Sequence, residues 1–514
     1  MGSLKIGWAA RDVSTGAPIN IPGQFHMRIS EGILDPVTVT ALVVDGGEDL
    51  TIFLSGDMVV IRSGLLDEIR AAVKAKNAEI PTEKILMNCT HAHTGPSHYY
   101  DDAAKITKSG TSTPLCSQVP HDGIEIASSD AYRHFLAGKA AEAVCEAYET
   151  RTEGGIAYGY GYAVVAHSRR VVYFDDVSKR PGAVINSTHG VNGHAVMYGN
   201  TNDDRFSHYE AGADHFVNLM FTFDSDEKLT GAIINIPCPS QNSEGEYFLS
   251  ADYWHDIRAL LRKKYGNIFI LPQCAAAGDL SPRILHYKAA QERRYRLKYG
   301  EIETKARNKQ ERINRMEIAE RVAACFDEVY AWAKKEIFTE LPVRHTVSMV
   351  ALSKRIITDE EYRIAEEGLT ALADKAFVKT DDPKDDLFHN SILAASRNRF
   401  EKIIDRYQTQ KEQPKLPMEL HVIQIGDIAF ASNRFELYMD YQHRIQARSP
   451  FIQTFIVQLA GQPGPDGGTY LCTERGAHGR GYSASMYCNI VSPEGGQELV
   501  EETVKILKEL HQEV

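Results

Sequence analysis

The segment ILMNCTHAHTGPSH, residues 85–98, leads from an apolar run directly into three histidines and a Gly-Pro turn. It is preceded by the apolar stretch LTIFLSGDM, residues 50–58, and by an amphipathic pattern over residues 64–77. Short apolar runs bounded by turn residues are typical of buried strands, and a spacing of three and four is typical of a helix. The three segments therefore predict a strand–helix–strand unit whose second strand ends at His91.

The same pattern occurs again further along the chain. GAIINIPC (residues 231–238), ADYWHDIRALLRKKYG (251–266) and NIFILPQ (267–273) predict a second strand–helix–strand unit. Between the two units, residues 154–168 and 214–224 alternate in hydrophobicity. Alternation of this kind is typical of antiparallel strands, and we expect the two segments at an edge of the sheet.

Long helical patterns interrupt and follow these units. Charged segments with an apolar stripe predict helical insertions at about residues 285–337 and 358–410. The remaining elements that we expect are strands at 421–433 and 454–461, a helix at about 435–447 and a last helix at 496–512. The fold class is therefore α/β, a mixed sheet body built from strand–helix–strand units with long helical insertions. We expect a single domain over residues 1–514.

Composition narrows the classes of function. A formal net charge of −12 argues against a nucleic-acid partner, because no basic surplus is present to displace counterions. No apolar stretch is long enough to cross a bilayer, and the first residues contain no secretory signal. The eight cysteines form no CxxC pair, which favours reduced thiols. We expect a cytoplasmic protein that acts on a small-molecule substrate, and a homo-oligomer stays open.

Polar clusters follow each of the apolar strands. Ligand sites of α/β folds lie beyond the carboxyl ends of strands, so these clusters predict one shared pocket. The clusters are residues 90–96, 239–244, 274–282 and 433–436, followed by Tyr470 and Tyr482 beyond the last strand.

The residues in these clusters have both chemical and structural interpretations. On an extended segment His91 and His93 would face the same side and reach one ion or one substrate group, and imidazole with carboxylate is a normal zinc donor set. The alternative is a polar loop without chemistry. Glu436 would also suit a helix start, where the dipole favours an acid. Ser281 would suit a helix N-cap, with Pro282 in the first turn.

Taken together, the motifs resemble the catalytic region of the neutral/alkaline, non-lysosomal ceramidase family. The matching segments are THAHTGP (residues 90–96), GDLSP (278–282), RFELYMDYQHRIQARSP (434–450), TYLCTERG (469–476) and GYSA (481–484). The resemblance runs in blocks from about residue 5 to residue 507. It includes no counterpart of the family's C-terminal immunoglobulin-like domain.

The resemblance implies a role for each matching residue. His91, Glu436 and Tyr470 would bind Zn²⁺ or another divalent metal. The residues that would contact substrate or the reacting atoms are His93, Arg169, Ser281 and Tyr482. In this scheme a metal-activated water attacks an amide carbonyl while nearby donors stabilise the oxyanion. Ser281 would be a nucleophile or a substrate contact.

One ligand of the family is missing. The second zinc histidine falls where this chain has NIPCPSQN, residues 235–242. Gln241 is our candidate for the vacant ligand position, and Cys238, His255 and His286 are alternatives. A change of donor type at this position would alter the metal preference.

The sequence therefore predicts a metal-dependent hydrolase that cleaves an amide or related bond in a small, polar molecule. An enzyme that acts on carbohydrate derivatives on the same scaffold is the first alternative. The second is a catalytically inactive, ligand-binding relative, because one metal ligand of the family is absent. Ceramide itself would need an apolar slot and access to a membrane. The sequence contains no amphipathic anchor that would give access to a membrane.

Overall fold

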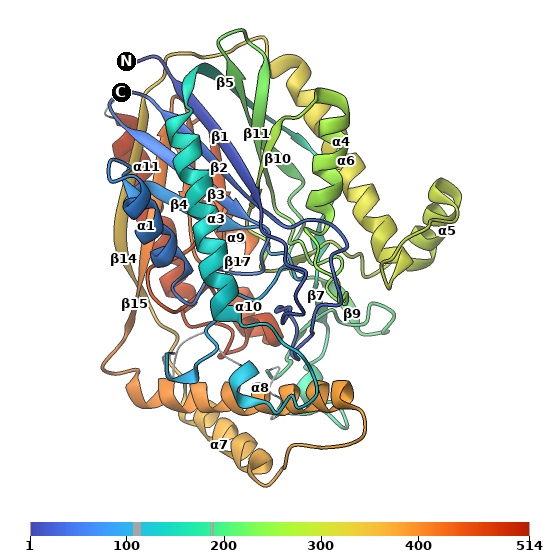
Figure 1. Cartoon of the computed structure of the whole chain (residues 1–514). Helices are drawn as coiled ribbons and strands as arrows, with labels where there is room; N and C mark the ends of the chain where they lie inside the picture. The colour runs from blue at the N-terminus through green and yellow to red at the C-terminus, as the bar shows by residue number, and fades with distance from the viewer. Residues whose placement is uncertain (1, 106–114, 186, 188–189, 513–514) are drawn as a thin grey trace.

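Two sheets packed face to face form the centre of the molecule (Figure 1). The computed structural model describes residues 2–105, 115–185, 187 and 190–512. Within them the larger sheet has eight strands in the order β12-β11-β10-β5-β1-β2-β3-β4. In that order the strands are Phe269–Cys274, Leu229–Ile236, Phe216–Asp224, Thr152–Tyr162, Lys5–Asp12, Thr38–Asp45, Leu50–Gly56 and Ile85–Cys89. The smaller sheet consists of β14 (Val343–Ser353), β15 (Lys415–Ile425), β16 (Ile428–Ser432) and β18 (Gln453–Val457).

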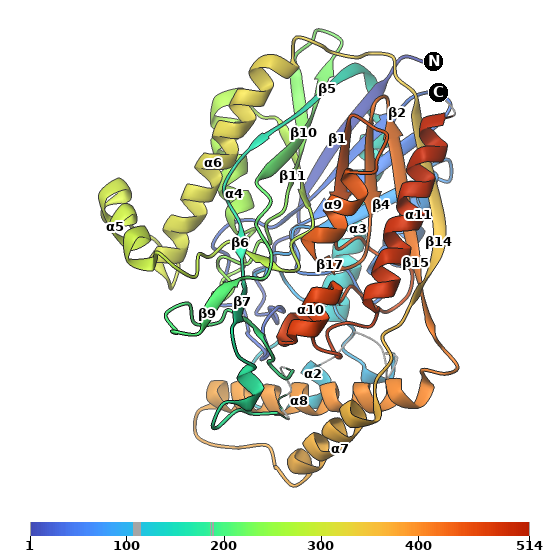
Figure 2. The same cartoon turned by 180° about the vertical axis from the view of Figure 1, so that it is seen from behind.

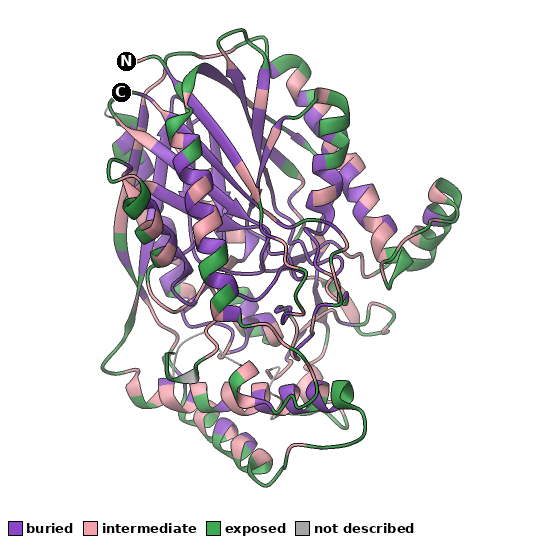
Figure 3. Ribbon diagram, viewed as in Figure 1, coloured by how far each residue is buried: buried purple, intermediate pink, exposed green. Residues whose placement is uncertain are grey.

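Helices cover the outer faces of both sheets (Figures 1 and 2). The larger sheet is covered by α1 (Leu65–Lys76), α3 (Ser129–Glu149), α4 (Tyr253–Tyr265) and α6 (Lys309–Ala333). The smaller sheet is covered by α9 (Met439–Gln446) and α11 (Pro493–Gln512). Alternate strand residues explain the layers: in β3, Phe53 packs between the sheets, whereas Ile52 and Leu54 pack under the helices. Figure 3 shows the resulting continuous buried centre.

The two predicted strand–helix–strand units are confirmed. β3 and β4 pair in parallel, as do β11 and β12. β1 and β5 pair only through Lys5–Ile6, so the larger sheet splays into two halves, each ending in one of these parallel pairs. The carboxyl ends of both pairs meet, since the Ser240 amide lies 3.4 Å from the Thr90 carbonyl and the His93 amide lies 3.2 Å from the Ser240 carbonyl.

The predicted edge position of residues 154–168 and 214–224 is wrong. β5 and β10 lie inside the sheet order and pair with each other along their length. In β5 the alternation arises because α6 packs over Gly159 and Gly161, while Tyr160 and Tyr162 lie on the exposed face. A Cβ atom at Gly159 would come within 2.2 Å of the Trp332 ring, so only glycine admits the helix there.

Both predicted helical insertions are present. The first contains α5 (Lys288–Tyr299) and α6, and the second contains α7 (Asp359–Ala373) and α8 (Pro383–Thr409). α6 packs on β5 and β10, whereas α8 extends across the end of the molecule with α7 beside it (Figure 2). No helix among the described residues has the length and apolarity to cross a membrane.

Shorter elements complete the described chain. They are α2 (Leu115–Gln118), β6 (His167–Ser168), β7 (Arg170–Tyr173), β8 (Ala195–Met197), β9 (Phe206–Tyr209), β13 (Leu280–Ser281), β17 (Glu436–Leu437), β19 (Tyr470–Leu471) and α10 (Glu474–Gly479), with four short 3-10 turns at Thr82–Lys84, Ala103–Lys105, Val177–Lys179 and Tyr482–Ala484.

A buried ionic network joins helix α1 to the smaller sheet. Arg70 donates two hydrogen bonds to the Glu419 carboxylate, at 2.6 and 3.0 Å. The His421 ring contacts the same carboxylate at 2.9 Å, and His345 contacts His421 at 2.9 Å. Burial alone would raise the pKa of Glu419, but hydrogen bonds from His421 and Arg70 outweigh it and lower the pKa to about 2.

The first prediction is that Glu419→Gln lowers the free energy of unfolding at pH 7 by on the order of 3 kcal/mol, because Arg70 loses its buried counter-charge. The wild-type contribution is present above the unfolded glutamate pKa near 4.5 and is lost as the pH falls toward 2. Urea unfolding between pH 7 and pH 3 measures this, and the difference between the two proteins should shrink with acid. Glu367→Gln, in an exposed pair with Arg363, is the control and should not change stability measurably. An equal effect of both substitutions would contradict the prediction.

Candidate functional site

A cavity of about 510 Å³ lies beyond the carboxyl ends of β4 and β11. Its volume suits a small organic ligand. The sequence-predicted residues in its walls are His91, His93, Arg169, Gln241, Glu436, Tyr470 and Tyr482. Ser281 does not belong to this lining. The clusters at residues 90–96, 239–244 and 433–436, with Tyr470 and Tyr482, thus converge on one pocket as expected from the sequence, whereas no residue of the cluster at 274–282 lines it.

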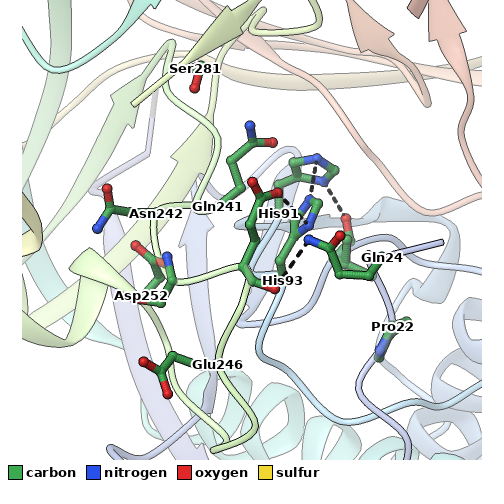
Figure 4. A network of polar contacts seen from close by, with 12 residues as sticks. Pro22, Gln24, His91, His93, Gln241, Asn242, Glu246, Asp252 and Ser281 are labelled. Atoms are coloured by element: carbon green, nitrogen blue, oxygen red, sulfur yellow. Dashed lines mark hydrogen bonds and ion pairs between the residues drawn. The ribbon is translucent and has the colours of Figure 1, made fainter. Parts of the chain in front are cut away.

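The two histidines meet, but the backbone between them is not extended as predicted. His91 has a φ of 62°, in the left-handed region that non-glycine residues rarely adopt. The Ala92 amide donates to the Met58 carbonyl at 3.1 Å, which fixes the turn after β4. The rings still lie edge to face, with their Nε2 atoms 3.2 Å apart (Figure 4).

The orientation of His91 is set by the main chain. Its Nδ1 lies 2.7 Å from the Val59 carbonyl oxygen, so Nδ1 carries a proton and donates it. Nε2 points instead at Glu436 Oε2, 3.3 Å away. In neutral His91 both of these atoms would be acceptors. Their proximity is favourable only with positive charge between or beside them, such as a proton on Nε2, a cation, or the Arg169 guanidinium 3.6 Å from Oε2.

Strand pairing places Glu436 beside Tyr470. β17 and β19 are parallel, with Glu436 in register with Tyr470, and the Glu436 amide donates to the Thr469 carbonyl at 2.9 Å. The predicted helix start at residue 435 is therefore wrong, because α9 begins at Met439 and Glu436 lies in a strand. Close approach of another segment fixes this strand: a Cβ atom at Gly278 would lie 2.3 Å from the Glu436 carbonyl oxygen.

Arg169 connects most of the site. Its Nη2 donates to the Tyr470 hydroxyl at 3.1 Å and lies 3.6 Å from Glu436 Oε2. Its Nη1 donates to Gln241 Oε1 at 3.3 Å. The GDLSP segment holds the arginine in place, since the Arg169 amide donates to the Asp279 carbonyl at 3.1 Å. A permanent cation therefore contacts three of the proposed metal-binding side chains.

Ser281 is not the predicted helix N-cap. It lies in β13, pairs with His167 of β6, and precedes α5 by several residues. The GDLSP segment pairs as a strand with the residues directly before Arg169, Leu280 with Ser168 and Ser281 with His167. Ser281 Oγ accepts hydrogen bonds from the Arg283 amide at 3.2 Å and from the Tyr198 hydroxyl at 3.4 Å. Figure 4 shows Gln241 between Ser281 and the histidines.

Tyr198 is a site residue that the sequence analysis missed. It lines the cavity and accepts a hydrogen bond from the Gln241 side-chain amide, so it links Gln241 to Ser281. Its φ is 56°, an uncommon conformation for a large residue. No motif surrounds it in the sequence, and the only local sign, the backbone strain, is invisible before folding.

Electrostatics favour a charged glutamate and a neutral second histidine. Burial by itself raises the pKa of Glu436, but the charges of His91 and Arg169 outweigh it and hold that pKa below its ordinary value. Burial, together with the positive charges of neighbouring side chains, lowers the pKa of His93 well below its ordinary range. Burial also raises the pKa of Tyr470 and of Tyr482, so both hydroxyls keep their protons.

The other candidates for the missing ligand lie elsewhere. Cys238, His255 and His286 are absent from the cavity lining. The buried Cys238 thiol donates to the Val165 carbonyl at 3.4 Å, and His286 contacts the Tyr209 hydroxyl at 2.7 Å. Across the described ranges no three or more His, Cys, Asp or Glu side chains gather where they would hold a metal ion. Of the four candidates for the missing ligand, Gln241 is thus the one that lines the cavity.

The second prediction concerns the link from Gln241 to Ser281. Tyr198→Phe and Ser281→Ala each remove one member of the same hydrogen bond, so each should lower the free energy of unfolding by about 1 kcal/mol. The double variant should lose at least about 0.5 kcal/mol less than the sum, because the interaction is lost only once.

Urea unfolding of the four proteins measures the coupling. Tyr173→Phe, whose hydroxyl donates to the Asn200 carbonyl at 2.9 Å, is the control and should be additive with Ser281→Ala. Additivity of the Tyr198 and Ser281 substitutions would show that the two hydroxyls do not interact.

Comparisons with solved structures identify the fold. Neutral ceramidase from Pseudomonas aeruginosa superposes with a TM-score of 0.65 at 16% sequence identity, covering 100% of this chain and 75% of that chain. A ceramidase complexed with C2 superposes with a TM-score of 0.63 at 15% identity, covering 100% and 76%. No protein-family model and no curated protein matches the sequence. The chain therefore has a neutral ceramidase-like fold, as its motifs predict.

Proposed function

We propose that this protein is a metal-dependent hydrolase that cleaves an amide or related bond in a small, polar molecule. The observation that carries the proposal is the contact between His91 Nε2 and Glu436 Oε2, at 3.3 Å, while His91 Nδ1 is bound to the Val59 carbonyl. A metal-binding histidine ordinarily donates its second N–H in this manner. A divalent ion would satisfy both facing acceptors.

The donor set fits such an ion. His91 and Glu436 would be two ligands, the Tyr470 hydroxyl a third, and the Gln241 carbonyl oxygen a fourth. Two oxygens and an amide oxygen beside one imidazole form a harder set than a two-histidine site, which favours harder divalent ions over soft ones. When bound, the ion would polarise the substrate carbonyl and lower the pKa of a bound water.

Side chains of the protein would stabilise the developing charge and position the substrate. Arg169 and the Tyr482 hydroxyl line the same cavity and would donate to the oxygen that develops negative charge. His93, 3.2 Å from His91, would contact the substrate beside the metal. Arg28 donates to the His93 backbone carbonyl at 2.6 Å, which holds the main chain at His93. Ser281 would affect the substrate only through its hydrogen bond with Tyr198.

A ligand-binding protein without catalysis is the second candidate. The observation that favours it is the contact of Arg169 with Glu436, Tyr470 and Gln241. A guanidinium so placed would supply the positive charge that the family receives from zinc. In that case the side chains would keep their arrangement without any metal.

The third prediction separates the two candidates by metal binding. Calorimetric titration with Zn²⁺ and Mn²⁺ should give one site per chain, and His91→Ala or Glu436→Gln should weaken it at least 100-fold by removing a ligand. Gln241→His should tighten zinc binding at least tenfold, because an imidazole is the better zinc donor. Gln273→Asn is the control, since this buried amide lies outside the cavity lining.

The same variants should also be assayed on simple N-acyl amides. Loss of turnover in His91→Ala and Glu436→Gln together with loss of metal supports the hydrolase. Wild-type protein that binds no divalent ion and cleaves no N-acyl probe would favour the ligand-binding protein instead.

A further inference from the structure

Helix α8 forms the wall of the cavity that faces away from the histidines. Four of its residues belong to the lining: Ala395, Arg399, Lys402 and Arg406. Their spacing of four, three and four places them on a single face of the helix. Three of the four are basic residues. Figure 1 shows α8 lying across one end of the molecule.

Charges are unevenly distributed around the cavity. The lining contains two carboxylates, Glu244 and Glu436. Glu244 lies 3.6 Å from His93, and Glu436 lies 3.3 Å from His91. The wall formed by α8 and Arg62 has no carboxylate in the described lining. Two acids outside the lining act on these cations, Asp466 on Lys402 and Glu361 on Arg406. Cations are therefore in excess at this end.

Three of these cations are close to one another. Lys402 is half-buried, and desolvation first, then the positive charges of Arg62 and Arg399, lower its pKa to about 7 despite the opposing effect of Asp466. Arg406 has a separate role, because it donates to the Met486 and Asn489 carbonyls at 2.6 and 3.1 Å. Clustered cations repel one another, and a bound anion would offset this repulsion.

An aromatic band separates the cations from the histidines. Arg399 lies over the rings of Phe25 and Tyr487, at 4.7 and 5.4 Å from their centroids. Phe25 contacts the Tyr482 ring at 5.2 Å, and Tyr482 contacts Tyr470 at 5.9 Å. The cavity thus has a polar end with His91, an aromatic middle, and a cationic end.

We propose that the cationic end, formed by Arg62, Arg399 and Lys402, binds an anionic group of the substrate, a carboxylate, sulfate or phosphate. The substrate would then carry its scissile bond at the His91 end, an apolar or planar segment in the middle and the anion at α8. The part of this proposal that concerns hydrolysis rests on the proposed function, whereas anion binding does not.

Binding of inorganic anions tests the site without turnover. Phosphate, sulfate and acetate are titrated into wild-type protein by calorimetry. We expect Arg399→Gln and Lys402→Gln to weaken binding of the preferred anion at least tenfold, and Lys402→Arg to retain it. Lys384→Gln, on the exposed start of the same helix, is the matched control and should bind as wild type. Equal anion binding by all variants, or none by wild type, would overturn the proposal.

Turnover of matched amides tests the substrate class. 4-Acetamidobenzoate carries an amide, a ring and a carboxylate in the proposed order, and 4-acetamidobenzamide is its neutral counterpart. 4-Acetamidobenzenesulfonate and 4-acetamidophenyl phosphate distinguish the type of anion. We expect wild-type kcat/KM to favour an anionic member at least tenfold, and Arg399→Gln to abolish that preference through KM. Equal turnover of charged and neutral amides would overturn the substrate class. Turnover of none would contradict the proposed function, while the titrations would still decide the anion site.

Discussion

The contact between His91 and Glu436 is the constraint on which the rest of the site depends. With His91 neutral, its Nε2 and Glu436 Oε2 are two acceptors 3.3 Å apart, which is unfavourable unless positive charge lies between or beside them. Arg169 provides part of that charge at 3.6 Å from the carboxylate. The fold holds the pair in place through main-chain contacts: the Val59 carbonyl orients His91, and pairing of β17 with β19 aligns Glu436 with Tyr470.

The two-sheet architecture explains why such distant residues converge. His91 follows a strand of the larger sheet, and Glu436 follows β16 of the smaller sheet. Packing the sheets face to face brings these strand ends to one end of the molecule, where neither sheet alone would form a pocket. α8 contributes a further wall to this cavity. The cavity is therefore shared by three layers, and its two ends differ in charge.

Local sequence patterns predicted the parallel strand pairs, the long helices and the cluster around His91, because apolar runs and strand-end motifs are local signals. The predictions were wrong where contacts between distant segments determine the structure. β5 is interior because β10 pairs with one of its sides and β1 with the other, and Ser281 pairs with His167 instead of capping a helix. Tyr198 joins the site from a loop without a motif. The cations of α8 resemble a solvated helix face in sequence, and only the tertiary structure turns them toward the cavity.

The most direct test of this account is diffraction at the zinc absorption edge from crystals of the wild-type protein equilibrated with Zn²⁺. The account predicts one anomalous peak between His91 Nε2 and Glu436 Oε2, at roughly 2.0–2.2 Å from each, with the Tyr470 and Gln241 oxygens turned toward it. A map with zinc bound elsewhere, or with none at this position and His91 still in direct contact with Glu436, would contradict it.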